Sequence, residues 1–128
     1  MHLVIEFQEE YKRLDALCKD MLSGEYGVTQ YINEMEKYSA LGKYKIEDWE
    51  HDYKDLKHVR WVRNQLAHEV GALQSGICKQ SDLLFVKGFH HRILKGKDPL
   101  ALLRKDIDKP QKKKEGFFTK LKRFFTGK

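Results

Sequence analysis

The chain has 128 residues, of which 41% are hydrophobic and 34% are charged, and its formal net charge at pH 7 is +6. A chain of this length builds one hydrophobic core, so we expect one folded domain. The two cysteines, Cys18 and Cys78, show no CxxC spacing, which excludes a disulfide framework and a cysteine-based zinc cluster.

The charge is divided unevenly along the chain. Residues 1–55 contain thirteen Asp and Glu against seven Lys and Arg, a net charge of −6, whereas residues 56–128 contain six against eighteen, a net charge of +12. This asymmetry predicts that the second half meets an anionic partner, or that an acidic face of one copy meets a basic face of another.

The sequence shows neither a secretion signal nor a membrane-spanning segment. The opening stretch MHLVIEFQEE turns acidic after its first residues, unlike a signal peptide. No apolar run approaches the roughly 18 residues of a membrane span. We therefore expect a cytoplasmic protein with reduced thiols.

The first two predicted helices follow from apolar residues at helical intervals. The first covers residues 3–22 and is expected to stop at Ser23–Gly24. Thr29 is the expected N-cap of the second, which extends to about Tyr38. We expect Gly42 to break the helical pattern after it.

The strongest helical pattern lies in the third helix, which follows Ile46–Glu50. Apolar residues recur there at spacings of three and four, which indicates one buried face. At about 100° per residue, Arg63 falls inside this apolar sector. Because a guanidinium keeps its charge, an Arg on a core-facing stripe needs an anionic or hydrogen-bonding partner. The stripe comprises Leu56, Val59, Val62, Leu66 and Val70.

Two shorter helices are predicted next. Ser81–Asp82 is the expected cap of a fourth helix that ends near Lys95, and Asp98–Pro99 combines an N-cap with proline at the first position of a fifth. With no alternating strand pattern, repeat or Gly-rich phosphate loop, residues 1–108 are predicted to form an all-α bundle of four or five helices.

Residues 109–128 differ in character. A charged linker precedes Gly116, and beyond it apolar and basic residues alternate with the period of a cationic amphipathic helix. The apolar face would carry Phe117, Phe118, Leu121, Phe124 and Phe125. Residues 112–128 are therefore expected to make weak contact with an anionic membrane surface or with nucleic-acid backbone, or else to form a disordered solubilising end.

A polar ridge runs along one edge of the third helix. Arg60, Asn64 and His68 are four residues apart, so they follow one another along the helix and can converge with Arg63 on a groove beside the core. Two plainer interpretations stay open. Arg63 would instead form a structural ion pair with a carboxylate of the first helix (Glu9, Glu10 or Asp15), and His68 would be a helix-terminal histidine without a chemical role.

The sequence Arg63-Asn64-Gln65-Leu66-Ala67-His68 resembles the motif of the HEPN superfamily, in which an Arg precedes a His by four to six residues on a late helix of a small α-bundle. The resemblance implies a HEPN-like fold, a homodimer whose motif helices meet in a shared cleft, and metal-independent endoribonuclease activity. In one subgroup a Tyr follows the His by two residues. Val70 occupies that position here, so regulation by nucleotide transfer onto such a Tyr is not expected.

The chemistry of RNA cleavage fits these residue types. The RNA 2′-OH attacks the neighbouring phosphate, which requires a group that moves protons near neutral pH and a fixed cation for the charge that grows on phosphorus. His68 is the candidate general acid or base, Arg63 the candidate phosphate clamp, and Asn64 a positioning hydrogen-bond donor. One motif His per chain supplies one proton carrier. Two facing copies would supply two, one as the general base and one as the general acid.

Further side chains are candidates for RNA binding. Trp61 would stack on a base, pack in the core or line a dimer interface, and the other four candidates carry positive charge or an imidazole. They are Arg60, Lys57, His90 and Arg92. The spacing of His51, Asp55 and His58 does not suit a metal, so we predict neither a metal site nor a cofactor.

Two function classes result from the sequence. The first is a dimeric, metal-independent endoribonuclease of toxin or defence type, whose partners are RNA, a second copy and an antitoxin or other protein. The alternative is a noncatalytic HEPN-like module that binds RNA, nucleotide or a protein partner. Cleavage of RNA in EDTA distinguishes them.

Overall fold

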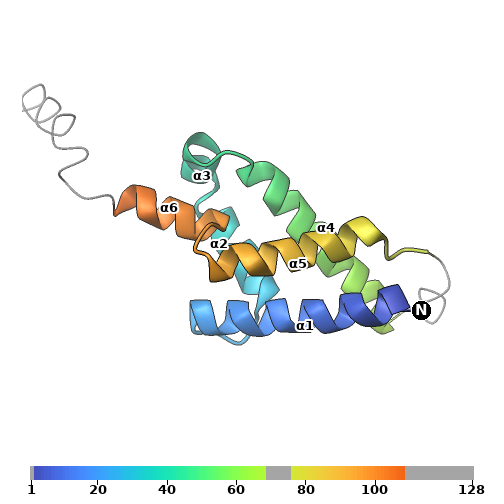
Figure 1. Ribbon diagram of the computed structural model, residues 1–128. Helices are drawn as coiled ribbons and strands as arrows, with labels where there is room; N and C mark the ends of the chain where they lie inside the picture. The colour runs from blue at the N-terminus through green and yellow to red at the C-terminus, as the bar shows by residue number, and fades with distance from the viewer. Residues whose placement is uncertain (1, 69–75, 109–128) are drawn as a thin grey trace, which may run out of the picture.

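A computed structural model describes residues 2–68 and 76–108, and these ranges contain six helices and no strand (Figure 1). The predicted all-α fold class is confirmed. The helices are α1 (His2–Leu22), α2 (Val28–Lys37), α3 (Ser39–Lys45), α4 (Trp49–His68), α5 (Gln80–Leu94) and α6 (Pro99–Ile107). The predicted C-terminal helix and linker, 109–128, lie outside the described residues.

The helices pack as a bundle in which α1 and α5 lie side by side (Figure 1). The second helix, α2, packs on both α1 and α4, while α3 contacts α6 at the end of the bundle where α1 finishes. None of the helices that the structure describes is long and apolar enough to cross a membrane.

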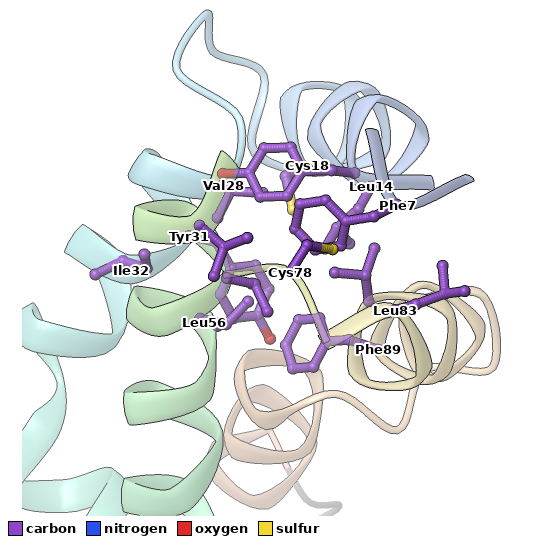
Figure 2. Close-up of a cluster of buried hydrophobic side chains, with 14 of the residues drawn as sticks. Phe7, Leu14, Cys18, Val28, Tyr31, Ile32, Leu56, Cys78, Leu83 and Phe89 are labelled. Atoms are coloured by element: carbon purple, nitrogen blue, oxygen red, sulfur yellow. The ribbon is translucent and has the colours of Figure 1, made fainter. Parts of the chain in front are cut away.

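One continuous core fills the space between the helices (Figure 2). The apolar stripe of α4 faces it as predicted, since Leu56, Val59, Val62 and Leu66 are all buried. The fifth member of the stripe, Val70, lies outside the described residues. Trp49, Tyr31, Phe7 and Phe89 are the largest fully buried side chains of the core.

The start of α2 is capped differently from the prediction. Thr29 does not cap it: the backbone N–H of Val28 donates to Asp15 Oδ1 of α1 at 2.8 Å. The N-cap position belongs to Gly27, whose φ is +56° and whose added Cβ would lie 2.1 Å from Asp15 Oδ1. Only glycine permits this turn and this close approach, so the cap depends on a contact between two helices.

Gly42 does not break the chain as predicted. It lies inside α3, is buried, and an added Cβ would lie 2.3 Å from Trp49 Cε2. Its role is to let the Trp49 indole pack directly on the backbone of α3. This short helix is the element that the predicted four or five helices did not include.

The cap predicted for α5 is wrong in position, because Lys79 and not Ser81–Asp82 is its N-cap, whereas the cap predicted for α6 is confirmed. Asp82 acts from the third position of α5, where Oδ2 accepts a hydrogen bond from the Lys79 backbone N–H at 2.9 Å. Asp98 caps α6 ahead of Pro99, as predicted, and accepts from the Ala101 N–H at 3.3 Å.

Asp98 is also the centre of a buried polar contact between α2 and α6. The Tyr31 hydroxyl donates to Asp98 Oδ2 at 2.5 Å and accepts from the Leu100 backbone N–H at 3.0 Å. Both Asp98 and Tyr31 are 0% exposed. Burial, the Asp98 charge and this hydrogen bond raise the pKa of Tyr31 well above its ordinary value, so the phenol stays a donor.

The first prediction concerns this contact. Tyr31→Phe should lower the free energy of unfolding by about 1–3 kcal/mol, because it leaves the buried Asp98 carboxylate short of a donor. Urea denaturation measures the change. Tyr53→Phe is the matched control: its hydroxyl donates to Glu36 at 2.6 Å at the surface, and we expect its loss to stay within about 0.5 kcal/mol. Equal losses in the two variants would contradict the prediction.

The second prediction concerns pH. Burial, with the nearby Asp15 charge, raises the pKa of the buried Cys18 thiol from 9.0 to about 12. The unfolded chain ionises near pH 9 while the folded chain keeps its proton, so this stabilisation is present below pH 9 and is lost as the pH rises towards 12.

The free energy of unfolding, measured by urea denaturation, should therefore fall between about pH 8 and about pH 10.5. Cys18→Ala should be less stable at both values but should lose less stability across the interval, because it lacks this ionisable group. Parallel curves for the variant and the unchanged protein would be inconsistent with the assignment.

Candidate functional site

The last turns of α4 carry the candidate site because one side of the helix is occupied by the core. Val59, Val62 and Leu66 face inward. The polar residues between them therefore lie along the solvent-facing edge of the last turns of α4, which we call the α4 rim. His68 is the last residue of the helix and its side chain is exposed. The site is therefore held by a well-packed helix and opens to solvent.

Arg63 is exposed, which corrects the expectation that it faces the core. Its guanidinium carbon lies 5.7 Å from the centroid of the Tyr11 ring, and Nη1 donates to Asn64 Oδ1 at 3.2 Å. The physical reason is the length of the side chain. Its stem leaves the apolar sector and carries the charge over the aromatic edge of α1 into water.

The structural ion pair with α1 is not formed among the described residues. Glu10 binds Arg13 at 3.0 Å, and Asp15 accepts from Val28 and lies 3.4 Å from Lys19. The Arg63 cation is thus held by a ring and an amide instead of by a carboxylate.

Tyr11 forms the platform beneath that cation. Burial and the Asp15 charge raise the pKa of Tyr11, and the positive charges of Arg63 and Arg60 oppose the shift in part. The phenol is neutral at ordinary pH, so it offers Arg63 an aromatic ring without neutralising its charge.

Asn64 contacts Arg63 and lies four residues before His68. It is half-buried, its Oδ1 is used by Arg63, and it precedes His68 by four residues, one turn of the same helix. With Oδ1 accepting from Arg63, the amide NH₂ is oriented away from the guanidinium and can donate to a ligand. Arg63, Asn64 and His68 all lie in the last two turns of α4, and Arg63 contacts Asn64. Convergence of all three on one groove stays a prediction.

Arg60 and Lys57 lie earlier on α4, and Arg60 is held more firmly than Lys57. Arg60 is half-buried and its Nη1 donates to Thr29 Oγ1 at 3.4 Å, which ties α4 to α2. Lys57 is exposed, with its ammonium 5.0 Å from the centroid of the Tyr53 ring. Both add positive charge along α4.

Trp61 is exposed, not a packing residue. Its side chain is 49% exposed, whereas that of Trp49 is 1% exposed and belongs to the core. The His58 ring stacks on Trp61 with a centroid distance of 6.1 Å and an interplanar angle of 24°. An exposed aromatic pair of this kind has the geometry on which another flat ring can stack.

Asp82 anchors this stack, and sequence reasoning missed it. His58 Nε2 lies 3.1 Å from Asp82 Oδ1, and Asp82 is 5% exposed. The i, i+3 spacing of His58 and Trp61 was visible in the sequence. The Asp82 contact was not, because it joins α4 to α5 across a segment that breaks the pattern.

Arg92 does not join the candidate RNA-binding residues, which corrects that assignment. Its guanidinium donates to both carboxylate oxygens of the buried Asp52, at 2.9 and 2.8 Å, and lies 5.3 Å from the Phe89 ring centroid. Asp52 precedes Arg63 by eleven residues, about 16 Å along the helix. Arg92 is a structural cation that fastens α5 to the first turn of α4. His90, two residues before it, is half-buried.

Within residues 2–68 and 76–108, no group of three or more His, Cys, Asp or Glu side chains is placed to hold a metal ion. The chemistry that these ranges offer at the α4 rim comes from an exposed imidazole, a guanidinium and an amide. Such a set can move a proton and stabilise a phosphate.

Comparisons with known proteins give one match. No curated protein and no solved structure matches the chain. A family of unknown function, DUF6548, matches residues 5–122, which include all of the helices from α2 to α6, nearly all of α1 and much of the basic C-terminal segment. Because this match covers far more than half of the sequence, the chain belongs to the family of unknown function DUF6548.

Proposed function

We propose that this protein is a metal-independent endoribonuclease of toxin or defence type that acts in the cytoplasm as a homodimer. The observation that carries the proposal is the placement of Arg63, whose guanidinium is exposed five residues before His68 on the same helix and is bound by Asn64 and Tyr11. The resemblance of residues 63–68 to the HEPN motif supports the same reading.

The chemistry requires one bond to form and one to break. The 2′-oxygen of RNA attacks the adjacent phosphorus while His68 accepts the 2′-hydroxyl proton, and the bond from phosphorus to the 5′-oxygen breaks as that oxygen gains a proton. The products are a 2′,3′-cyclic phosphate and a 5′-hydroxyl. Arg63 would bind the nonbridging oxygens, where negative charge grows in the transition state.

The surroundings of Arg63 support its role as a clamp. A long side chain in water loses considerable conformational freedom when it binds a phosphate. The Tyr11 ring and Asn64 Oδ1 already restrict the guanidinium, so less of that cost falls on the bound complex. Because no carboxylate among the described residues neutralises it, its charge is available to an anion.

A second copy would complete the proton transfer. The reaction needs a base for the 2′-hydroxyl and an acid for the leaving oxygen, and each chain brings one His68 to its α4 rim. Two rims that face each other would provide two imidazoles and two guanidinium groups in one cleft. An antitoxin or other protein partner that covers this rim would block the activity.

Trp61 supports RNA as the substrate class. Trp61 and His68 are seven residues apart, two turns along the same side of α4, about 10 Å. Because Asp82 fixes His58 behind it, Trp61 is a restrained platform on which a base can stack while its phosphate lies near the motif.

The third prediction tests catalysis. In buffer with EDTA, His68→Ala and Arg63→Ala should each lower the rate of RNA cleavage by roughly 10²–10⁴-fold, because each removes a group used in the transition state. Gel analysis of end-labelled RNA measures the rate and identifies the cyclic phosphate. His91→Ala and Arg13→Ala, which change exposed residues on α5 and α1, are the matched controls and should cleave normally.

Cleavage that survives both motif substitutions would refute these roles. RNA binding by the unchanged protein with no cleavage of any of several structured and single-stranded RNAs would favour the noncatalytic module instead.

The fourth prediction tests base stacking. On a His68→Ala background, Trp61→Ala should weaken binding of single-stranded RNA by roughly tenfold or more at fixed salt, because stacking on one base is lost. Fluorescence anisotropy of a labelled oligonucleotide gives the affinity. Tyr44→Ala removes an aromatic side chain that is 84% exposed on α3 and serves as the control. The stacking role fails if both substitutions weaken binding equally.

A further inference from the structure

A groove of about 390 Å³ lies between the end of α1, α2 and α6, and the proposed function does not use it. Its walls are mainly apolar and include Leu103 and Leu100 of α6 and Leu22 of α1. Glu34 of α2 and Arg104 of α6 are its charged members. The groove has the size and the largely apolar lining of a binding site.

The groove has an uncovered apolar rim. Met21, Tyr38 and Ile107 line it and are 38%, 41% and 54% exposed, respectively. Met21 belongs to α1, Ile107 belongs to α6, and Tyr38 is the C-cap residue of α2, so the fold gathers them into one patch. Exposed apolar side chains that are gathered beside a hollow mark an interaction surface more often than scattered ones do.

The end of α6 lies at the groove, so the segment that follows it is a candidate occupant of the groove. Helix α6 ends at Ile107, which is itself a groove residue, and the last described residue is Asp108. Residues 109–116 can span at most roughly 26–29 Å when fully extended. Residues 117–125 therefore stay within reach of the groove, at an effective concentration of roughly millimolar for so short a tether.

The composition of residues 117–125 matches the groove. As a helix this segment would place all of its apolar side chains on one face and its basic ones elsewhere. Glu34 and Arg104 of the groove wall balance each other in charge, and the negative end of the α1 dipole at Met21–Leu22 favours a cationic segment there. The family match reaches residue 122, so most of this segment belongs to the pattern of the family.

We propose that residues 117–125 dock through their Phe and Leu side chains into the groove between α1, α2 and α6 of the same chain. Docking covers Met21, Tyr38 and Ile107 and withdraws the apolar face from the membrane or nucleic-acid contact that its composition also suits. This proposal does not depend on the ribonuclease activity.

Disulfide trapping in the full chain tests the docking. Met21→Cys/Leu121→Cys places one thiol at the groove rim and one in the segment. Under mild oxidation at low micromolar protein concentration, we expect an intramolecular disulfide to form at least about tenfold faster than in Leu84→Cys/Leu121→Cys. Leu84 is 60% exposed on α5 and is not a groove residue. Mass spectrometry of peptides identifies the bond.

The native cysteines interfere little, because burial raises the pKa of Cys18 to about 12 and that of Cys78 to about 11, which suppresses their thiolates. Adding Phe124→Ser and Phe125→Ser should reduce trapping at residue 21 to the rate of the Leu84 pair. Equal rates in the two original pairs would overturn the proposal. Disulfides found only between two chains would overturn it as well, because the occupant would then be the segment of a second copy.

Discussion

The hydrogen bond from the Tyr31 hydroxyl to Asp98 is the contact on which the arrangement of the helices depends most. It links α2 to the first turn of α6 across 67 positions of sequence, with both partners fully buried. A buried carboxylate is costly without donors, so α6 is confined to the place where Tyr31, Ala101 and the helix start can serve it. That position of α6 creates the groove beside α1, and Tyr31 also holds α2 against the core that supports α4.

The first part of α4 makes buried contacts with other helices, and its second part carries exposed charged residues. Near its start, the buried Asp52 binds Arg92 of α5 through two hydrogen bonds, and Trp49 packs against Gly42 of α3. From its middle onward, His58 contacts Asp82 while Arg63 and His68 are exposed. The first part is fixed by buried pairing, which costs more to break than surface pairing. The second part thereby gains a rigid base for exposed charged groups.

The sequence predicted well those features that depend on local periodicity and caps. The stripe of Leu56, Val59, Val62 and Leu66 is buried as expected, and Asp98 followed by Pro99 starts α6. The errors in the caps and helix ends come from tertiary contacts that local periodicity does not show. Thr29 does not cap α2 because the Asp15 carboxylate does so from another helix, and Gly42 lies within a helix because it accommodates Trp49.

At the candidate site, too, the sequence predicted the positions of residues along the helix but not their contacts with other helices. The sequence correctly placed Arg63, Asn64 and His68 in one helix, and their convergence on a single groove stays a prediction. The angular position of Arg63 put its charge in the core, which was wrong. A side chain with several methylene groups can leave its sector, so the position of its Cβ does not fix the position of its charge. Arg92 was assigned to RNA on its charge alone, and its true partner, Asp52, is forty residues away. A basic residue is therefore informative about ligands only once its acidic neighbours in space are known.

The proposed nuclease rim and the proposed docking groove occupy opposite parts of the fold, and this separation has a physical consequence. The end of α4 lies near the start of α1, whereas α6 lies beyond the end of α1 (Figure 1). A segment docked beside Met21 and Ile107 leaves Trp61 and His68 open. Its basic residues would then lie beside the end of α1, in the half of the chain whose net charge is negative. RNA attraction would consequently depend on the cations of α4, and because surface charges lose influence beyond about 10 Å, the α4 rim would retain its own positive field.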